Sequence, residues 1–226
     1  MIVSSVNYKG GTGKSTMAQN LAVAFTLKGY KVCIVDADDT GATMDWSEDR
    51  HEMELEPAIT CTQLTNPSSF TSQVKALYKD GGYDLLIIDC PPALSPIAVK
   101  AMSISDYLFI PLNTTGGNDI KVTQKLLKEF QKIREIKEDS GGRVEAYLLA
   151  NGYKANVILH ESVIKIMDQL CEHYKVKRFQ TVVHHRVVYG EASMQGRGVV
   201  ELDNRKAKIE IGRLVSEILA MAATEA

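Results

Sequence analysis

The sequence contains little of what would mark a secreted, zinc-binding or membrane-spanning protein. Its 226 residues include only four cysteines and one tryptophan, and no apolar run approaches the length that crosses a bilayer. The cysteines lack C-x-x-C spacing and nearby histidine pairs, which predicts buried free thiols rather than disulfides or zinc ligands. The first residues also lack the pattern of a signal peptide. We therefore expect a cytoplasmic protein.

A strong charge of either sign is also missing. The sequence holds 26 Lys and Arg against 28 Asp and Glu, a formal net charge of −2. Such a balance gives no overall attraction to a polyanion, so binding of nucleic acid would need a local basic patch. The length suits one α/β domain rather than two, and no linker, repeat or low-complexity tract interrupts it. We expect a single domain over residues 1–226.

The most informative stretch lies near the N-terminus. Residues 7–16 read N-Y-K-G-G-T-G-K-S-T, between an apolar run at 2–6 and a helical pattern that begins at Met17. A glycine turn between a strand and a helix lets backbone N–H groups bind phosphate oxygens, and the positive end of the helix adds to the attraction. Lys14 would neutralise the β- and γ-phosphates, and the Ser15 hydroxyl would hold Mg²⁺. The predicted phosphate-binding residues are Lys9, Gly10, Gly11, Thr12, Gly13, Lys14, Ser15 and Thr16.

Carboxylates follow two other apolar runs, at residues 31–36 and 83–89. Because ligands bind at the carboxyl edge of a parallel sheet, we expect Asp36 and Asp89 near the phosphates. Asp89 would bind the magnesium sphere and Asp36 its outer shell, while Asp38 would orient a water toward the γ-phosphate. The alternative for the acidic residues at 36–39 is that they only cap the next helix. Cys90, beside Asp89, has no adjacent base in the sequence and is not expected to be reactive.

Apolar runs and amphipathic segments alternate through the rest of the chain. They predict strands at 58–64, 105–112, 144–150 and 176–179, and helices at 41–50, 68–78, 119–138, 157–174 and 203–222. Trp46 is expected to be a packing residue. The predicted fold class is α/β, with a doubly wound, mostly parallel sheet and helices on both faces.

The helix predicted at 119–138 combines an apolar side with a basic side. The apolar side consists of Val122, Leu126, Phe130, Ile133 and Ile136. The basic side consists of Lys121, Lys125, Lys128 and Lys132, which recur at four-, three- and four-residue steps. A solvated face partly neutralised by Glu129 and Glu135 is the simpler interpretation, and contact with the DNA backbone is the other. The last helix adds further basic residues on its more exposed sides, namely Arg205, Lys206, Lys208 and Arg213.

The phosphate loop departs from the general pattern G-x-x-x-x-G-K-[ST] at Tyr8 and gains Lys9. K-G-G-T-G-K-S-T resembles the deviant Walker A box of the ParA/MinD family of ATPases. The resemblance extends to D-A-D-D-T at 36–40, where the family usually has D-x-D-P-Q, and to Asp89 with the following prolines. It also covers the tract at 181–196 around Arg186, where His185 replaces the usual proline.

The resemblance implies ATP with Mg²⁺ as ligands and Lys9, Lys14 and Asp38 as catalytic residues. Lys9 would reach across a nucleotide-sandwich homodimer to the partner's phosphates, which makes it both catalytic and phosphate-binding. Asn151, at the end of the strand predicted at 144–150, lies where related ATPases often contact the base. His184 and His185 are adjacent in a segment expected to be extended, which would point them to opposite faces and argues against a metal pair.

The likeness is strongest to small plasmid-partition ATPases of the ParF kind, because no helix-turn-helix domain precedes the first strand. It implies a slow ATPase whose ATP-bound dimer binds nonspecific DNA on the nucleoid. A ParB-like, centromere-binding partner would stimulate hydrolysis, so that plasmid or chromosomal DNA is segregated.

Two other functions share this phosphate site. A MinD-like ATPase that cycles on a membrane needs a basic amphipathic tail, whereas residues 221–226 are short and acidic, so no membrane contact is expected. A metabolic ATP-dependent enzyme of the same fold, such as a ligase, would not need Lys9.

Overall fold

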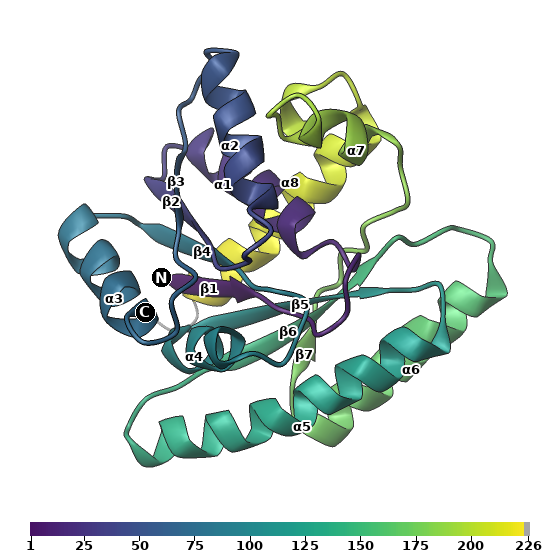
Figure 1. The fold of residues 1–226 in the computed structure, drawn as a ribbon. Coiled ribbons are helices and arrows are strands. Elements are labelled where there is room, and N and C mark those ends of the chain that lie inside the picture. The colour runs from purple at the N-terminus through teal and green to yellow at the C-terminus, as the bar shows by residue number, and fades with distance from the viewer. Residues whose placement is uncertain (224–226) are drawn as a thin grey trace.

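The computed structural model describes residues 1–223, which form a seven-stranded sheet between two layers of helices (Figure 1). The strands are β1 (Ile2–Ser5), β2 (Val32–Asp36), β3 (Thr60–Gln63), β4 (Leu85–Asp89), β5 (Tyr107–Asn113), β6 (Glu145–Asn151) and β7 (Lys177–Arg178). The helices are α1 (Lys14–Thr26), α2 (Ala42–Glu52), α3 (Phe70–Gly81), α4 (Pro96–Ile104), α5 (Gly117–Asp139), α6 (Ile158–Tyr174), α7 (Val188–Ser193), the 3₁₀ helix η1 (Val199–Glu201) and α8 (Arg205–Ala223).

All strand pairs are parallel, in the order β3-β2-β4-β1-β5-β6-β7. The chain therefore builds the sheet outward from β1 in one direction and then in the other, which confirms the predicted doubly wound α/β fold. The connection reverses beside β1, and a crevice forms at the carboxyl end of strands at such a switch point. In the ladder Ser5 lies opposite Asp89, and Asp89 opposite Asp36. The register thus places the end of β1 and the two predicted carboxylates side by side.

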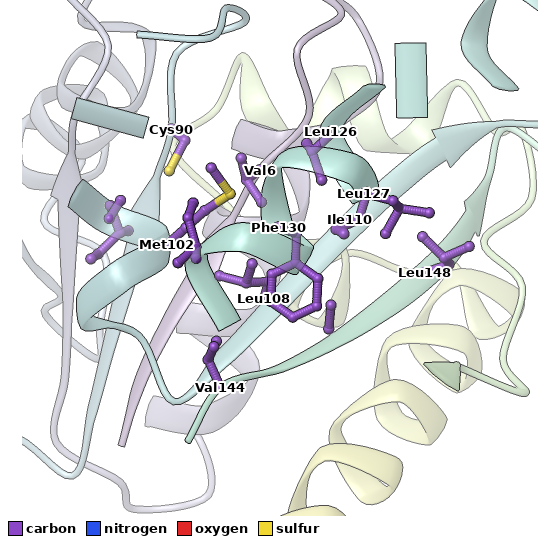
Figure 2. Packing of buried hydrophobic residues seen from close by; sticks show 14 of the residues in the cluster. Val6, Cys90, Met102, Leu108, Ile110, Leu126, Leu127, Phe130, Val144 and Leu148 are labelled. Atoms are coloured by element: carbon purple, nitrogen blue, oxygen red, sulfur yellow. The ribbon is translucent and has the colours of Figure 1, made fainter. Parts of the chain in front are cut away.

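Side chains alternate along each strand, so the sheet has one apolar cluster on each face. Leu108 of β5 belongs to the cluster under α3, α4, α5 and α6, whereas its neighbour Phe109 belongs to the cluster under α1 and α8. Figure 1 shows these helix layers on opposite sides of the sheet. Figure 2 shows Phe130 of α5 against Leu108, with Val144 close by. The two cores fix the strand ends from which the candidate site is built.

Helix α2 is fastened to a distant part of the chain. The indole Nε1 of Trp46 donates to the carbonyl oxygen of Arg197 at 3.2 Å. Arg50 donates to the carbonyl oxygen of Gly196 and to both carboxylate oxygens of Glu201, at 2.9–3.0 Å. Trp46 is fully buried, which confirms its predicted packing role. The helix that follows the Asp36–Asp38 loop therefore holds the 196–201 segment.

Three details differ from the sequence-based expectation. Helix α4 was not predicted, because the two prolines at 91–92 suggested irregular chain; Ser95 caps it by accepting the N–H of Ala98, and Pro96 suits the first helical position. Helix α7, within the tract at 181–196, was not predicted either. Ile136, assigned to the apolar side of α5, is 68% exposed.

Within residues 1–223, no helix combines the length and the apolar character that a bilayer span requires. The argument against a membrane-binding tail used residues 221–226. Of these, residues 224–226 lie outside the described part of the chain.

Candidate nucleotide-binding site

Two carbonyl groups of the loop between β1 and α1 are held by side chains from the ends of β5 and β6. The side-chain amide of Asn113 donates to the carbonyl oxygen of Gly11 at 2.9 Å, and that of Asn151 to the carbonyl oxygen of Thr12 at 2.7 Å. By contrast, the N–H groups of residues 13–16 have no hydrogen-bond partner within the described chain. Free N–H groups at the start of a helix are the arrangement that binds phosphate oxygens.

Gly13 occupies a position that no other residue fits. Its φ of +95° lies in the left-handed region, and a Cβ at this site would lie 2.2 Å from Nδ2 of Asn151. Asn113 and Asn151 are the last residues of β5 and β6 and face each other in the ladder. The structure therefore places Asn151 at the loop backbone; its predicted contact with a base stays a prediction.

The Lys14 side chain lies within the site rather than in solvent. Its Nζ is 3.4 Å from the carbonyl oxygen of Lys9, and the residue is 6% exposed. Burial lowers the pKa of Lys14, and the carboxylates of Asp89 and Asp38 act in the opposite direction. A buried ammonium group beside free N–H groups suits a polyphosphate; the role of Lys14 in binding one stays a prediction.

Asp89, at the end of β4, is fully buried. Its Oδ2 accepts the Thr43 hydroxyl at 2.7 Å, while its Oδ1 has no partner within residues 1–223. Burial raises the pKa of Asp89 to about 6, against the opposing effect of the Ser15 and Thr43 hydroxyls. A buried carboxylate oxygen without a partner, near the Ser15 hydroxyl, fits a hydrated Mg²⁺ ion that also binds phosphate.

The Asp36 carboxylate accepts hydrogen bonds from the backbone of the loop and helix that follow β2. Its Oδ2 accepts the N–H groups of Thr43 and Met44 at 3.0 Å, and its Oδ1 accepts that of Asp38 at 3.0 Å. It thus caps the first turn of α2 and shapes the loop before it, as the alternative interpretation of the acidic residues anticipated. Burial raises the pKa of Asp36 in spite of these bonds. Its place in the outer shell of the metal stays a prediction.

Asp38 lies beside the phosphate loop and is partly exposed. Its Oδ1 accepts the N–H of Thr40 at 3.1 Å, and its charge acts on Lys14. One carboxylate oxygen therefore shapes the turn, and the charge of the group lies close enough to Lys14 to act on it. This placement is compatible with the predicted role in orienting water.

Lys9 does not point its charge at the phosphate cradle of its own chain. Its Nζ forms an ion pair with Oδ2 of Asp119 at 2.5 Å, in the first turn of α5. Lys9 is about one-third exposed, whereas the Asp119 side chain is 3% exposed.

Of two other residues singled out in the sequence, Arg186 lies outside the site and Cys90 is inert. Arg186 binds Glu210 of α8, with Nη2 2.5 Å from Oε1. Burial raises the pKa of Cys90 to about 12, so its thiol is not a nucleophile at neutral pH.

Sequence reasoning missed Asn113, Asp119 and Thr43. Asn113 and Asp119 flank the Gly-Gly pair at 116–117 that precedes α5, and polar residues at a predicted strand end are a usable signal. Thr43 gives no such signal, because its contact with Asp89 depends on how α2 packs.

Comparison with known proteins agrees with this geometry. The CbiA family, described as the CobQ/CobB/MinD/ParA nucleotide binding domain, matches residues 3–199. Maintenance of carboxysome distribution protein A of Halothiobacillus neapolitanus is 25% identical over 217 residues, covering 94% of each chain. The chromosome-partitioning ATPase Soj of Thermus thermophilus is 24% identical over 224 residues, covering 88% of this chain and 87% of Soj.

Among solved structures, the septum site-determining protein MinD of Pyrococcus horikoshii, complexed with Mg-ADP, superposes with a TM-score of 0.69. It is 22% identical, and the match covers 100% of this chain and 98% of that one, so the two share a fold. The family match spans most of the sequence and includes the phosphate loop, Asp36 and Asp89. The chain therefore belongs to the CobQ/CobB/MinD/ParA family of nucleotide-binding domains.

Proposed function

We propose that this ATPase is a partition-type positioning protein, which dimerises with ATP, binds nonspecific DNA and hydrolyses ATP when a partner protein acts on it. The observation that carries the proposal is Lys9. Its ammonium group is held by α5 and leaves the neutralisation of the chain's own phosphates to Lys14. A second copy would provide a use for this charge, because closing two polyphosphates between subunits requires additional cations.

Each residue then has a role in the cycle. The N–H groups of residues 13–16 and Lys14 bind the phosphates, and Ser15 and Asp89 hold Mg²⁺, which supplies charge neutralisation between the β- and γ-phosphates. Asp38 positions the attacking water. Asn113 and Asn151 keep the loop carbonyls turned away from the phosphates. Lys9 leaves Asp119 and enters the site of the other subunit.

The cargo is proposed to be DNA, of a plasmid or a chromosome, with a ParB-like centromere-binding partner. The name of the Thermus relative, a chromosome-partitioning ATPase, supports DNA. The name of the Halothiobacillus relative concerns carboxysome distribution, and the same cycle would serve such a cargo. The cycle is proposed to run in the cytoplasm, on the nucleoid.

The DNA contact is proposed to lie on α8 rather than on α5. The two basic sets lie on opposite helix layers, so one duplex cannot contact both on the same subunit (Figure 1). On α5, Lys132 is paired with Glu129 at 3.1 Å. Four basic side chains of α8 are exposed and make no ion pair within residues 1–223, namely Arg205, Lys206, Lys208 and Arg213.

The test is binding of a nonspecific DNA duplex to the ATP-bound protein across a salt series. Alanine at Arg205, Lys206 and Lys208 is expected to reduce the affinity about tenfold or more and to flatten the salt dependence. The matched control, alanine at Lys121, Lys125 and Lys128, is expected to change little. Absence of DNA binding together with ATP-dependent sedimentation on anionic liposomes would replace this function by the MinD-like one.

A further inference from the structure

The two edges of the sheet differ in how they are protected. The β7 edge is only two residues long, Lys177 and Arg178, and so offers little backbone to another strand. The β3 edge reads Thr-Cys-Thr-Gln and holds neither a charge nor a proline. Within residues 1–223 no strand pairs with its outer side. The β3 edge is therefore open to a further strand.

The register of β3 shows which backbone groups face outward. Leu64, just after the strand, donates its N–H to the carbonyl oxygen of Asp36 at 2.9 Å, toward β2. Because backbone groups alternate in direction along a strand, those of Cys61 and Gln63 point away from β2. Neither N–H has a hydrogen-bond partner in the described chain. Two donor and acceptor pairs thus face the open edge.

A cavity lies beside this edge on each face of the sheet. On the α2 side, Leu55 and Ile59 are among the residues that line a cavity of about 740 Å³. On the α3 side, Leu64 and Leu77 are among those that line a cavity of about 510 Å³. Successive side chains of a strand point to opposite faces, so a strand added beside β3 would direct them alternately into the two cavities.

The surroundings of the edge are acidic. Residues 48–56 carry five carboxylates, and two of them, Glu54 and Glu56, line the cavity on the α2 side. The one arginine among them, Arg50, is buried and held by Glu201 and backbone carbonyls. Asp80 borders the cavity on the α3 side. The charge around the edge therefore favours a cationic ligand.

We propose that the β3 edge binds an extended basic peptide of a partner protein, which adds a strand to the sheet. Its backbone pairs with Cys61 and Gln63, its small apolar side chains enter the cavities, and its lysines or arginines meet the carboxylates at 48–56. This surface is distinct from the phosphate loop, and the binding requires no nucleotide. The proposal therefore goes beyond the ATPase cycle and does not depend on it.

The probe is a synthetic eight-residue peptide of alternating valine and lysine with blocked ends, titrated into the nucleotide-free protein. We expect binding with slowed hydrogen exchange at the amides of Cys61 and Gln63. Two N-methylated versions separate strand pairing from charge attraction. Methylation of the amides on one edge of the peptide abolishes binding, whereas methylation of the other edge leaves it intact.

Charge is tested on the protein with the double variant Glu54→Gln, Glu56→Gln, which keeps a side-chain acceptor for the N–H of Ala58. We expect affinity for the peptide to fall about tenfold. The control, Glu135→Gln with Glu138→Gln on α5, leaves it unchanged. The proposal is overturned if both methylated peptides bind as the parent does, if exchange slows elsewhere instead, or if a second copy of the chain occupies the edge.

Discussion

The ammonium group of Lys9 lies 2.5 Å from Oδ2 of Asp119, and Oδ1 of the same carboxylate is buried without a partner in the described residues. Lys9 is thus bound within its own subunit, by a residue in the first turn of α5. Under the proposed cycle the pair must separate when two subunits close. An ion pair with one partly exposed partner contributes about 1 kcal/mol, which dimerisation would have to offset.

Lys9→Ala is expected to remain monomeric when saturated with a nonhydrolysable ATP analogue, because the second cation of each site is missing. Asp119→Asn is expected to dimerise at about thirtyfold lower protein concentration, because two retaining ion pairs of about 1 kcal/mol, one in each subunit, no longer have to be broken. Sedimentation velocity across a protein dilution series measures both. Lys28→Ala, an exposed lysine on the turn after α1, is the control. An ATP-bound dimer of Lys9→Ala would contradict the assigned role.

Asp38→Ala is expected to bind ATP and dimerise like the wild type but to lose turnover by about a hundredfold or more, because no carboxylate orients the water. Steady-state phosphate release, with and without DNA, measures the loss. Asp39→Ala changes an exposed neighbouring carboxylate and should keep its activity. Normal hydrolysis by Asp38→Ala would remove this residue from the mechanism.

Asn151→Ala and Asn113→Ala are each expected to weaken ATP binding about tenfold, since a free loop carbonyl can turn toward the phosphates. Tripolyphosphate, which has no base, distinguishes the two roles of Asn151. If Asn151 shapes the loop, affinity for ATP and tripolyphosphate falls equally. A loss confined to ATP would instead support the contact with the base that the family resemblance implies.

The raised pKa of Asp89 predicts a pH dependence of stability. Its pKa of about 6 exceeds the ordinary value of 3.8, so the ligand-free folded state binds this proton more tightly than the unfolded chain. The resulting stabilisation is complete below about pH 4 and is lost as the pH rises through about 6.

Asp89→Asn is therefore expected to be more stable than the wild type at pH 7.5, by about 1–3 kcal/mol, and nearly equal to it at pH 4. Urea unfolding of both ligand-free proteins at several pH values measures the difference. The variant should also lose the stabilisation that Mg²⁺ with ATP confers on the wild type. A difference that does not vary with pH would show that Asp89 does not titrate in this range.

Much of the site could be predicted from local patterns. The glycine loop, Lys14 and Asp89 each follow an apolar run, so their meeting at one sheet edge follows from parallel topology alone. The contact between Lys9 and Asp119 could not be predicted, because it joins residues 110 positions apart through the rotamer of a flexible side chain. For Asp36 the position and, as one of two alternatives, the capping of the next helix were predicted, but the choice between them needed the structure.

Errors in the predicted elements have local causes. The two prolines at 91–92 obscured the start of α4, although Ser95 and Pro96 form a good helix start. On α5 the apolar pattern continues to Ile136, but this side chain is exposed. Periodicity reports the face of a helix and not the length over which that face is covered.

Helix α2 connects Asp36, in the candidate site, with the 196–201 segment. A Cβ on Gly196 would lie 2.4 Å from the backbone nitrogen of Arg50, so these backbones touch. Together with the hydrogen bonds from Trp46 and Arg50, this contact fixes α2 to the 196–201 segment. A rigid displacement of α2, whose first turn is anchored to Asp36, must carry the 196–201 segment with it.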